Sequence, residues 1–124
     1  MKKEVENWWK QAKADLATAK DNVDIERFSY AIFLSEQAVE KALKSLYLKK
    51  FNEIARIHDL TIFAKKLNLP LKLYHDCEDL TNVYTETRYP DVSDIIPAER
   101  YTKEEADEFV KKAEEVIKWI KDKI

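Results

Sequence analysis

The sequence predicts an all-α fold, an up-and-down antiparallel helical bundle of four long helices plus one short helix. Apolar residues recur at the three- and four-residue spacing of amphipathic helices along most of the 124 residues. The chain has no glycine and only three prolines, which disfavours tight β-hairpins and excludes glycine-built phosphate or dinucleotide loops. Charged residues make up 37% of the chain, as expected for helices with solvated outer faces. We therefore expect a single domain over residues 1–124.

The first two helices are predicted at about residues 4–23 and 27–50 by their apolar stripes. The first stripe consists of Val5, Trp8, Ala12, Leu16, Ala19 and Val23. The second stripe consists of Phe28, Ala31, Ile32, Ser35, Ala38, Val39, Ala42 and Leu46. Tyr30, Leu34 and Leu48 widen the apolar surface of the second helix onto another face. We therefore expect this helix to lie at the centre of the bundle.

A short third helix and a long fourth helix are predicted next. Asp59 is a suitable N-cap for the third helix, and Asn68 and Pro70 end it. Its apolar residues are Leu60, Phe63, Ala64 and Leu67. The fourth helix, at about residues 71–88, carries the stripe Leu73, Cys77, Leu80 and Tyr84. Pro90 disfavours helix at the residue before it, so the fourth helix should stop there.

The last helix is predicted to begin at a capping box, after a loop at about residues 89–101. In the string Thr102-Lys103-Glu104-Glu105, the first and last side chains can each accept from the other residue's backbone N–H. The apolar stripe that follows consists of Ala106, Phe109, Val110, Ala113, Val116, Ile117 and Ile120. Short connections between such helices favour antiparallel neighbours.

Two charged residues fall in apolar registers. Arg88 continues the core stripe of the fourth helix, where a guanidinium needs a carboxylate, a phosphate or access to solvent. It can favour the helix C-terminus, pair with Asp91 or Glu40, or bind a ligand. Glu40 lies among apolar residues of the central helix. It should therefore find a positive partner, such as Arg88 or His58, or have a raised pKa.

Other polar residues have competing interpretations. His58 stands just before a helix start, where it can cap the helix or act as a general acid or base. Lys41 and Lys44 favour a solvated face of their helix. The tyrosines that flank the 89–101 loop can pack beneath it or stack on a base, and packing is favoured: Tyr84, Tyr89 and Tyr101. Cys77 should be a buried thiol and His75 exposed, and no metal site is expected.

Three strings in a fixed order resemble the HEPN family, and the resemblance covers nearly the whole chain. They are Ser35-Glu36-Gln37-Ala38-Val39-Glu40-Lys41-Ala42-Leu43-Lys44, then His58-Asp59-Leu60, and then Thr87-Arg88-Tyr89-Pro90-Asp91. The resemblance implies a bundle similar to the C-terminal domain of kanamycin nucleotidyltransferase. It also implies a homodimer and a nucleotide or RNA ligand. No cofactor is expected. The residues that the resemblance places in a ligand site are Gln37, Glu40, Lys41, His58, Arg88, Tyr89 and Asp91.

The RNA-cleaving members of the family use an arginine that is followed after four to six residues by a histidine. Residues 51–53 before His58 and residues 68–70 before His75 contain no arginine. We therefore predict a non-catalytic nucleotide-binding and interaction module. It would act as a dimer with a separately encoded minimal nucleotidyltransferase, as in a toxin–antitoxin pair. The alternative is a metal-independent RNase that uses Arg88 and His58, and an assembly protein without a ligand is a third interpretation.

Assembly and location are predicted from fewer observations. Trp9 and Trp119 lie outside the main stripes, which predicts a second buried surface and a homodimer contact above about 1,000 Å². The net charge of −2 does not favour broad capture of nucleic acid, although a local basic strip remains compatible with it. The sequence shows no signal peptide or membrane span, so a cytoplasmic location without membrane contact is expected.

Overall fold

The computed structural model describes residues 2–91 and 94–124, and only the backbone of Tyr84, Thr85 and Arg88. The described residues contain no strand. The helices, in chain order, are α1 (Lys3–Asp24), α2 (Phe28–Phe51), α3 (Leu60–Lys66), α4 (Leu71–Arg88), α5 (Pro97–Arg100) and α6 (Lys103–Lys123). The four long helices and the short α3 follow the predicted bounds to within a few residues.

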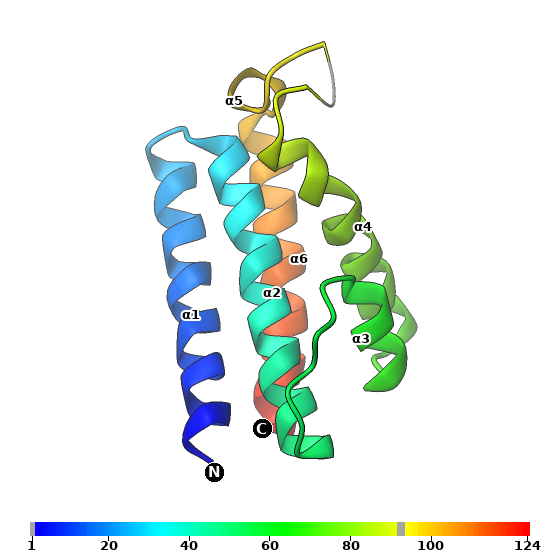
Figure 1. Ribbon diagram of the computed structural model, residues 1–124. Coiled ribbons are helices and arrows are strands. Elements are labelled where there is room, and N and C mark those ends of the chain that lie inside the picture. The colour runs from blue at the N-terminus through cyan, green and yellow to red at the C-terminus, as the bar shows by residue number, and fades with distance from the viewer. Residues whose placement is uncertain (1, 92–93) are drawn as a thin grey trace.

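The long helices alternate in direction, so the structure confirms the up-and-down antiparallel bundle (Figure 1). Helix α2 lies in the middle and contacts each of the other five helices, as the breadth of its apolar surface predicted. The segment between α2 and α3 runs back alongside α2 (Figure 1). Helix α5 lies at one end of the bundle, and both chain ends lie at the other end (Figure 1).

Local signals in the sequence set the helix ends. The Asp59 side chain accepts from the backbone N–H of Thr61 at 2.9 Å and caps α3. Asn68, two residues after the end of that helix, adopts the left-handed conformation, with φ of 55°. The capping box at α6 is present, with Glu105 N–H donating to Thr102 Oγ1 at 3.2 Å. These three predictions are confirmed.

The prediction of loop throughout residues 89–101 is wrong at α5. Pro97 opens this four-residue helix at its first turn, where a missing N–H costs nothing and the fixed φ is already helical. The Tyr101 hydroxyl, just after α5, donates to Glu86 Oε2 at 3.1 Å. Burial, and then the hydrogen bond with Glu86, raise the pKa of Tyr101 to about 12. Tyr101 therefore packs against α4, as expected.

The first helix is rotated relative to the predicted stripe. Trp9, at 9% exposure, belongs to the core, whereas Trp8 is only half-buried. Trp119 is half-buried and packs against the same core. Placing Trp9 on a second surface was therefore wrong, because the interior of this one chain already buries it. Cys77 is fully buried, as predicted, and burial raises the pKa of its thiol to about 12.

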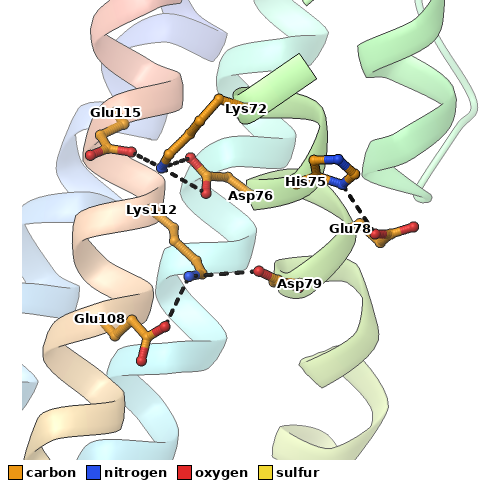
Figure 2. Close-up of polar contacts among 8 residues, drawn as sticks. All are labelled: Lys72, His75, Asp76, Glu78, Asp79, Glu108, Lys112 and Glu115. Carbon is orange, nitrogen blue, oxygen red and sulfur yellow. Dashed lines mark hydrogen bonds and ion pairs between the residues drawn. The ribbon is translucent and has the colours of Figure 1, made fainter. Parts of the chain in front are cut away.

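A charge network joins α4 to α6 (Figure 2). Lys72 Nζ pairs with Asp76 at 2.9 Å and with Glu115, and Lys112 Nζ pairs with Glu108 at 3.0 Å and Asp79 at 3.6 Å. Burial raises the pKa of Asp76, which is 3% exposed, while Lys72 acts in the opposite direction. The hydrogen bond from Lys72 lowers the pKa of Glu115. Lys72 therefore compensates a buried carboxylate between the two helices.

Beside this network, the His75 side chain is 58% exposed and lies 3.5 Å from Glu78 (Figure 2). The prediction that His75 is exposed is confirmed.

Candidate functional site

The candidate site is built on polar residues that α2 carries into the interior. Glu36, Glu40 and Lys44 follow one another at intervals of four residues, so they share one face of the helix. Glu36 is fully buried and Glu40 is 7% exposed. Because α2 is surrounded by the other helices, two carboxylates lie where apolar side chains would ordinarily pack.

Glu40 is the centre of the cluster. Its Oε2 lies 3.3 Å from Lys44 Nζ and 3.4 Å from His58 Nδ1. Its Oε1 is buried and has no hydrogen-bond partner among the described residues. The expectation that Glu40 finds a positive partner is confirmed, and that partner is Lys44 of the same helix. One oxygen of this carboxylate is therefore an unused acceptor that the surrounding side chains close off from solvent.

The segment between α2 and α3 positions His58. Asn52 ends α2 in the left-handed conformation, with φ of 56°, and turns the chain back along the helix. Two residues after His58, the Leu60 backbone N–H donates to Thr81 Oγ1 of α4 at 3.0 Å. His58 does not cap α3, because Asp59 does. Its imidazole is 75% exposed, so the cluster opens to solvent on this side.

The geometry favours one tautomer of a neutral His58. A carboxylate only accepts, so the Glu40 contact is a hydrogen bond when Nδ1 carries the proton, which leaves Nε2 as an acceptor. Lys44 Nζ lies 5.3 Å over the ring of Trp8, so the lysine is held between α1 and the Glu40 carboxylate. The cluster thus combines a fixed imidazole, a cation and a buried acceptor.

Two other predicted site residues on α2 have different partners. Lys41 Nζ donates to Asp15 Oδ2 of α1 at 2.5 Å, and Gln37 Nε2 donates to Glu36 Oε2 at 3.0 Å. The Lys41 and Lys44 side chains are 24% and 11% exposed, so their assignment to a solvated face was wrong. The reason is that α1 and the Glu40 carboxylate cover this side of α2. Lys41 joins α1 to α2 and is separate from the contacts of Glu40 and His58.

The remaining predicted residues lie at the α4 end that faces α5. Arg88 is the last residue of α4, and its side chain lies outside the described residues, as does its predicted pairing with Glu40 or Asp91. The Tyr84 side chain lies outside them too. Tyr89 is 47% exposed, and Asp91 is also exposed. The start of α3 is held by Thr81 of α4. Tyr89 lies eight residues further along the chain, or about 12 Å at the rise of a helix, so it is well away from that point.

Sequence reasoning missed Glu36 and Asp15 and did not assign Lys44 to Glu40. The spacing of four residues from Glu36 to Glu40 and Lys44 was a usable signal, since such residues are neighbours on a helix. Asp15 was not predictable in the same way. Its contact with Lys41 depends on how α1 is rotated against α2, which the stripe did not define.

In the part of the chain that the structure describes, no three His, Cys, Asp or Glu side chains gather into a metal-binding group. Within the same part, no helix is both long and apolar enough to span a bilayer.

The fold and the polar centre of α2 define a small helical-bundle protein with an ionised interior. A model of the HEPN domain matches residues 5–123, and this chain therefore belongs to the HEPN family. It is 29% identical over 126 residues to a protein of Methanocaldococcus jannaschii named "Putative toxin MJ1304", covering 91% of this chain and 83% of that one.

Solved structures share the fold over almost the whole chain. TT1696 from Thermus thermophilus has a TM-score of 0.91 and 28% identity, covering 99% of this chain and 100% of that one. ST0689, described as an archaeal HEPN homologue, has a TM-score of 0.85 and 35% identity, covering 98% of both chains. An HEPN domain protein of Thermotoga maritima has a TM-score of 0.75 and 26% identity, covering 94% and 95%.

Proposed function

We propose that this protein is a non-catalytic HEPN module that binds a nucleotide or RNA. In this proposal it forms a homodimer and acts with a separately encoded minimal nucleotidyltransferase, as in a toxin–antitoxin pair. The observation that carries the binding role is the Glu40 carboxylate, whose Oε1 is buried and unpartnered among the described residues beside an exposed imidazole.

The chemistry of the cluster suits a ligand with hydrogen-bond donors. A buried acceptor without a partner costs about 1–3 kcal/mol, so a donor that reaches it recovers that energy on binding. Nucleobase amino groups and ribose hydroxyls are such donors. His58 offers Nε2 and an exposed ring at the opening, and Lys44 pairs with the Glu40 carboxylate at 3.3 Å.

The partner and the toxin–antitoxin context rest on family membership and on the name of the relative from Methanocaldococcus jannaschii. Exposed apolar side chains in and near the α1–α2 turn and just before α5 support the homodimer: Ile25, Tyr30, Ile95 and Ile96 are 45–63% exposed. Light scattering at micromolar concentration should give twice the mass of the 14.7 kDa chain. A monomer would count against the dimer.

Calorimetry with ATP, GTP and a short RNA tests the site. Glu40→Gln keeps the size of the side chain but removes the charge, and Arg88→Ala removes the cation that the sequence places near the ligand. Each should weaken binding by about 1.5–3 kcal/mol. Lys65→Ala, on an exposed side chain of α3, is the matched control and should change nothing. Equal affinities for all four proteins would remove the ligand role from the cluster.

A metal-independent RNase is the second candidate, and one observation favours it. Glu40 holds Nδ1 of the exposed His58 at 3.4 Å, an arrangement that orients an imidazole for proton transfer. The missing family motif speaks against it, because residues 51–53 contain no arginine. RNA cleavage that His58→Ala abolishes would place this candidate first.

A further inference from the structure

A groove of about 630 Å³ runs between α1 and α6, two helices that carry none of the Glu40, Lys44 and His58 cluster. Helix α1 packs mainly against α2, which leaves this side open. The apolar lining residues are Trp9, Leu16 and Ile117. The charged lining residues are Lys13, Lys111, Lys118, Lys121, Glu114 and Glu115.

The charges of the groove are unbalanced. None of its four lysines forms an ion pair with a described residue, whereas both of its glutamates are already paired. Glu114 lies 3.5 Å from Lys20 Nζ, and Glu115 pairs with Lys72. Lys111 acts electrostatically on Glu115, whose pKa it helps to lower, so the groove's excess of positive charge lies with Lys13, Lys118 and Lys121, although the whole chain carries a net charge of −2. This is the local basic strip that the composition left open.

Lys121 lies in the last turn of α6, but the other lysines of the groove are not explained by the ends of the helices. Lys13 and Lys111 lie in the middle of α1 and α6, away from the last turn, where basic side chains offset the helix dipole. Lys13 Nζ lies 5.7 Å from the Trp9 ring, so its aliphatic stem extends the apolar surface. An apolar strip bordered by cations is complementary to a surface that is apolar in its centre and acidic at its edges.

An amphipathic helix fits this pattern better than RNA. Trp9 and Leu16 are seven residues apart on α1, or about 10.5 Å. Apolar side chains of a docked helix recur at the same spacing, every two turns. RNA binding to such a groove would need an exposed ring for base stacking, and Trp9 is only 9% exposed.

We infer that the α1–α6 groove is the docking site for an acidic amphipathic helix of the partner protein. The apolar side chains of that helix would lie against the half-buried Leu16 and the aliphatic stem of Lys13, and its carboxylates would face Lys13 and Lys118. The inference rests on the proposed function, because the partner is the separately encoded nucleotidyltransferase. It adds the surface and the chemistry of that contact, which lies apart from the ligand cluster.

Binding of the purified nucleotidyltransferase to charge variants tests the inference. The variant Lys13→Glu/Lys118→Glu should weaken binding by at least about tenfold, because two attractive contacts become repulsive. The control Lys10→Glu/Lys66→Glu makes the same charge change at exposed lysines outside the groove lining and should bind like wild type. Carbodiimide, which joins amines to carboxylates in contact, should link Lys13 or Lys118 to acidic residues of the partner. Circular dichroism should show equal helicity for all proteins.

The outcomes separate the two proposals. Absence of any complex with the wild type would contradict the proposed function and the docking site together. A complex that tolerates the groove variant as well as the control would contradict the docking site alone. If the Lys13→Glu/Lys118→Glu variant lost binding to a fluorescein-labelled 12-nucleotide RNA but still bound the partner, the groove would be an RNA site and the inference would be overturned. If the same variant gave a monomer mass in light scattering but still bound the partner, the groove would be the contact with a second copy of this chain. That result would also overturn the inference.

Discussion

At the scale of single residues, burial controls the chemistry of Cys77. The thiol is fully buried, and its pKa is raised from 9.0 to about 12, first by burial and then by the nearby charge of Asp76. A rise of three pH units means about a thousandfold less thiolate at a given pH. The native thiol should therefore react with Ellman's reagent only as fast as the protein opens. Reaction as rapid as that of the urea-unfolded chain would contradict this account of Cys77.

Lys72 should contribute to stability because it pairs with the buried carboxylate of Asp76. Lys72→Met should lower the free energy of unfolding at pH 7 by about 1 kcal/mol, a modest value because Lys72 is 66% exposed and its ion pairs are screened by solvent. Lys103→Met removes only a pair that is 63% and 51% exposed, and it should change the urea midpoint less. Equal midpoint shifts for the two variants would contradict the role of Lys72.

The pH dependence of the Lys72→Met effect follows from the directions of the pKa shifts. The lowered pKa of Glu115 adds stability above its unfolded pKa, and this stability is lost as the pH falls through the folded value. The raised pKa of Lys72 adds stability below 10.5, which is lost at higher pH. Asp76 has a raised pKa, so its ionised form costs stability at neutral pH and acid relieves that cost. The difference between wild type and Lys72→Met should therefore shrink as both carboxyls protonate.

Several residue-scale properties were predictable from the sequence and others were not. The burial of Cys77, the exposure of His75 and the need of Glu40 for a cation follow from register alone. Whether Trp8 or Trp9 faces the core does not, because both lie three or four residues from Val5 and Ala12. The choice sets the rotation of α1, and with it the contact of Asp15 with Lys41.

At the scale of elements, the start of α6 depends on its capping box. Thr102→Ala should lower the free energy of unfolding by about 1 kcal/mol through loss of the hydrogen bond to Glu105 N–H. Thr18→Ala is a suitable control, since Thr18 bonds back to Ala14 within α1 and such bonds add little. Urea titrations compare the two. A Thr102→Ala midpoint equal to that of the control would show that the cap adds no stability.

The close packing around α2 makes a second prediction at this scale. Ala38 has no exposed surface, so Ala38→Leu should overpack the core and cost about 1–3 kcal/mol. Ala17→Leu adds the same atoms at an exposed position of α1 and should leave the urea midpoint nearly unchanged. An unchanged midpoint for Ala38→Leu would mean that α2 faces its neighbours differently.

Helix bounds were predictable because apolar periodicity and capping residues are local signals. The four-residue α5 was not predicted, since one turn carries no apolar periodicity and only Pro97 signalled it. The candidate site was predictable in part. Glu40 and His58 meet as expected, but Lys41 turns to α1, because interhelical partners depend on tertiary packing.

At the scale of the whole molecule, the chain is an HEPN bundle whose central helix carries buried charge that opens to solvent at His58. The central claim is that this cluster binds and does not cleave. The most direct measurement is incubation of the protein with a labelled single-stranded RNA in the presence of EDTA, with binding and strand length followed together. We predict that bound RNA is recovered intact, at the length of the protein-free control. RNA shortened by the wild type but left intact by His58→Ala would contradict the account.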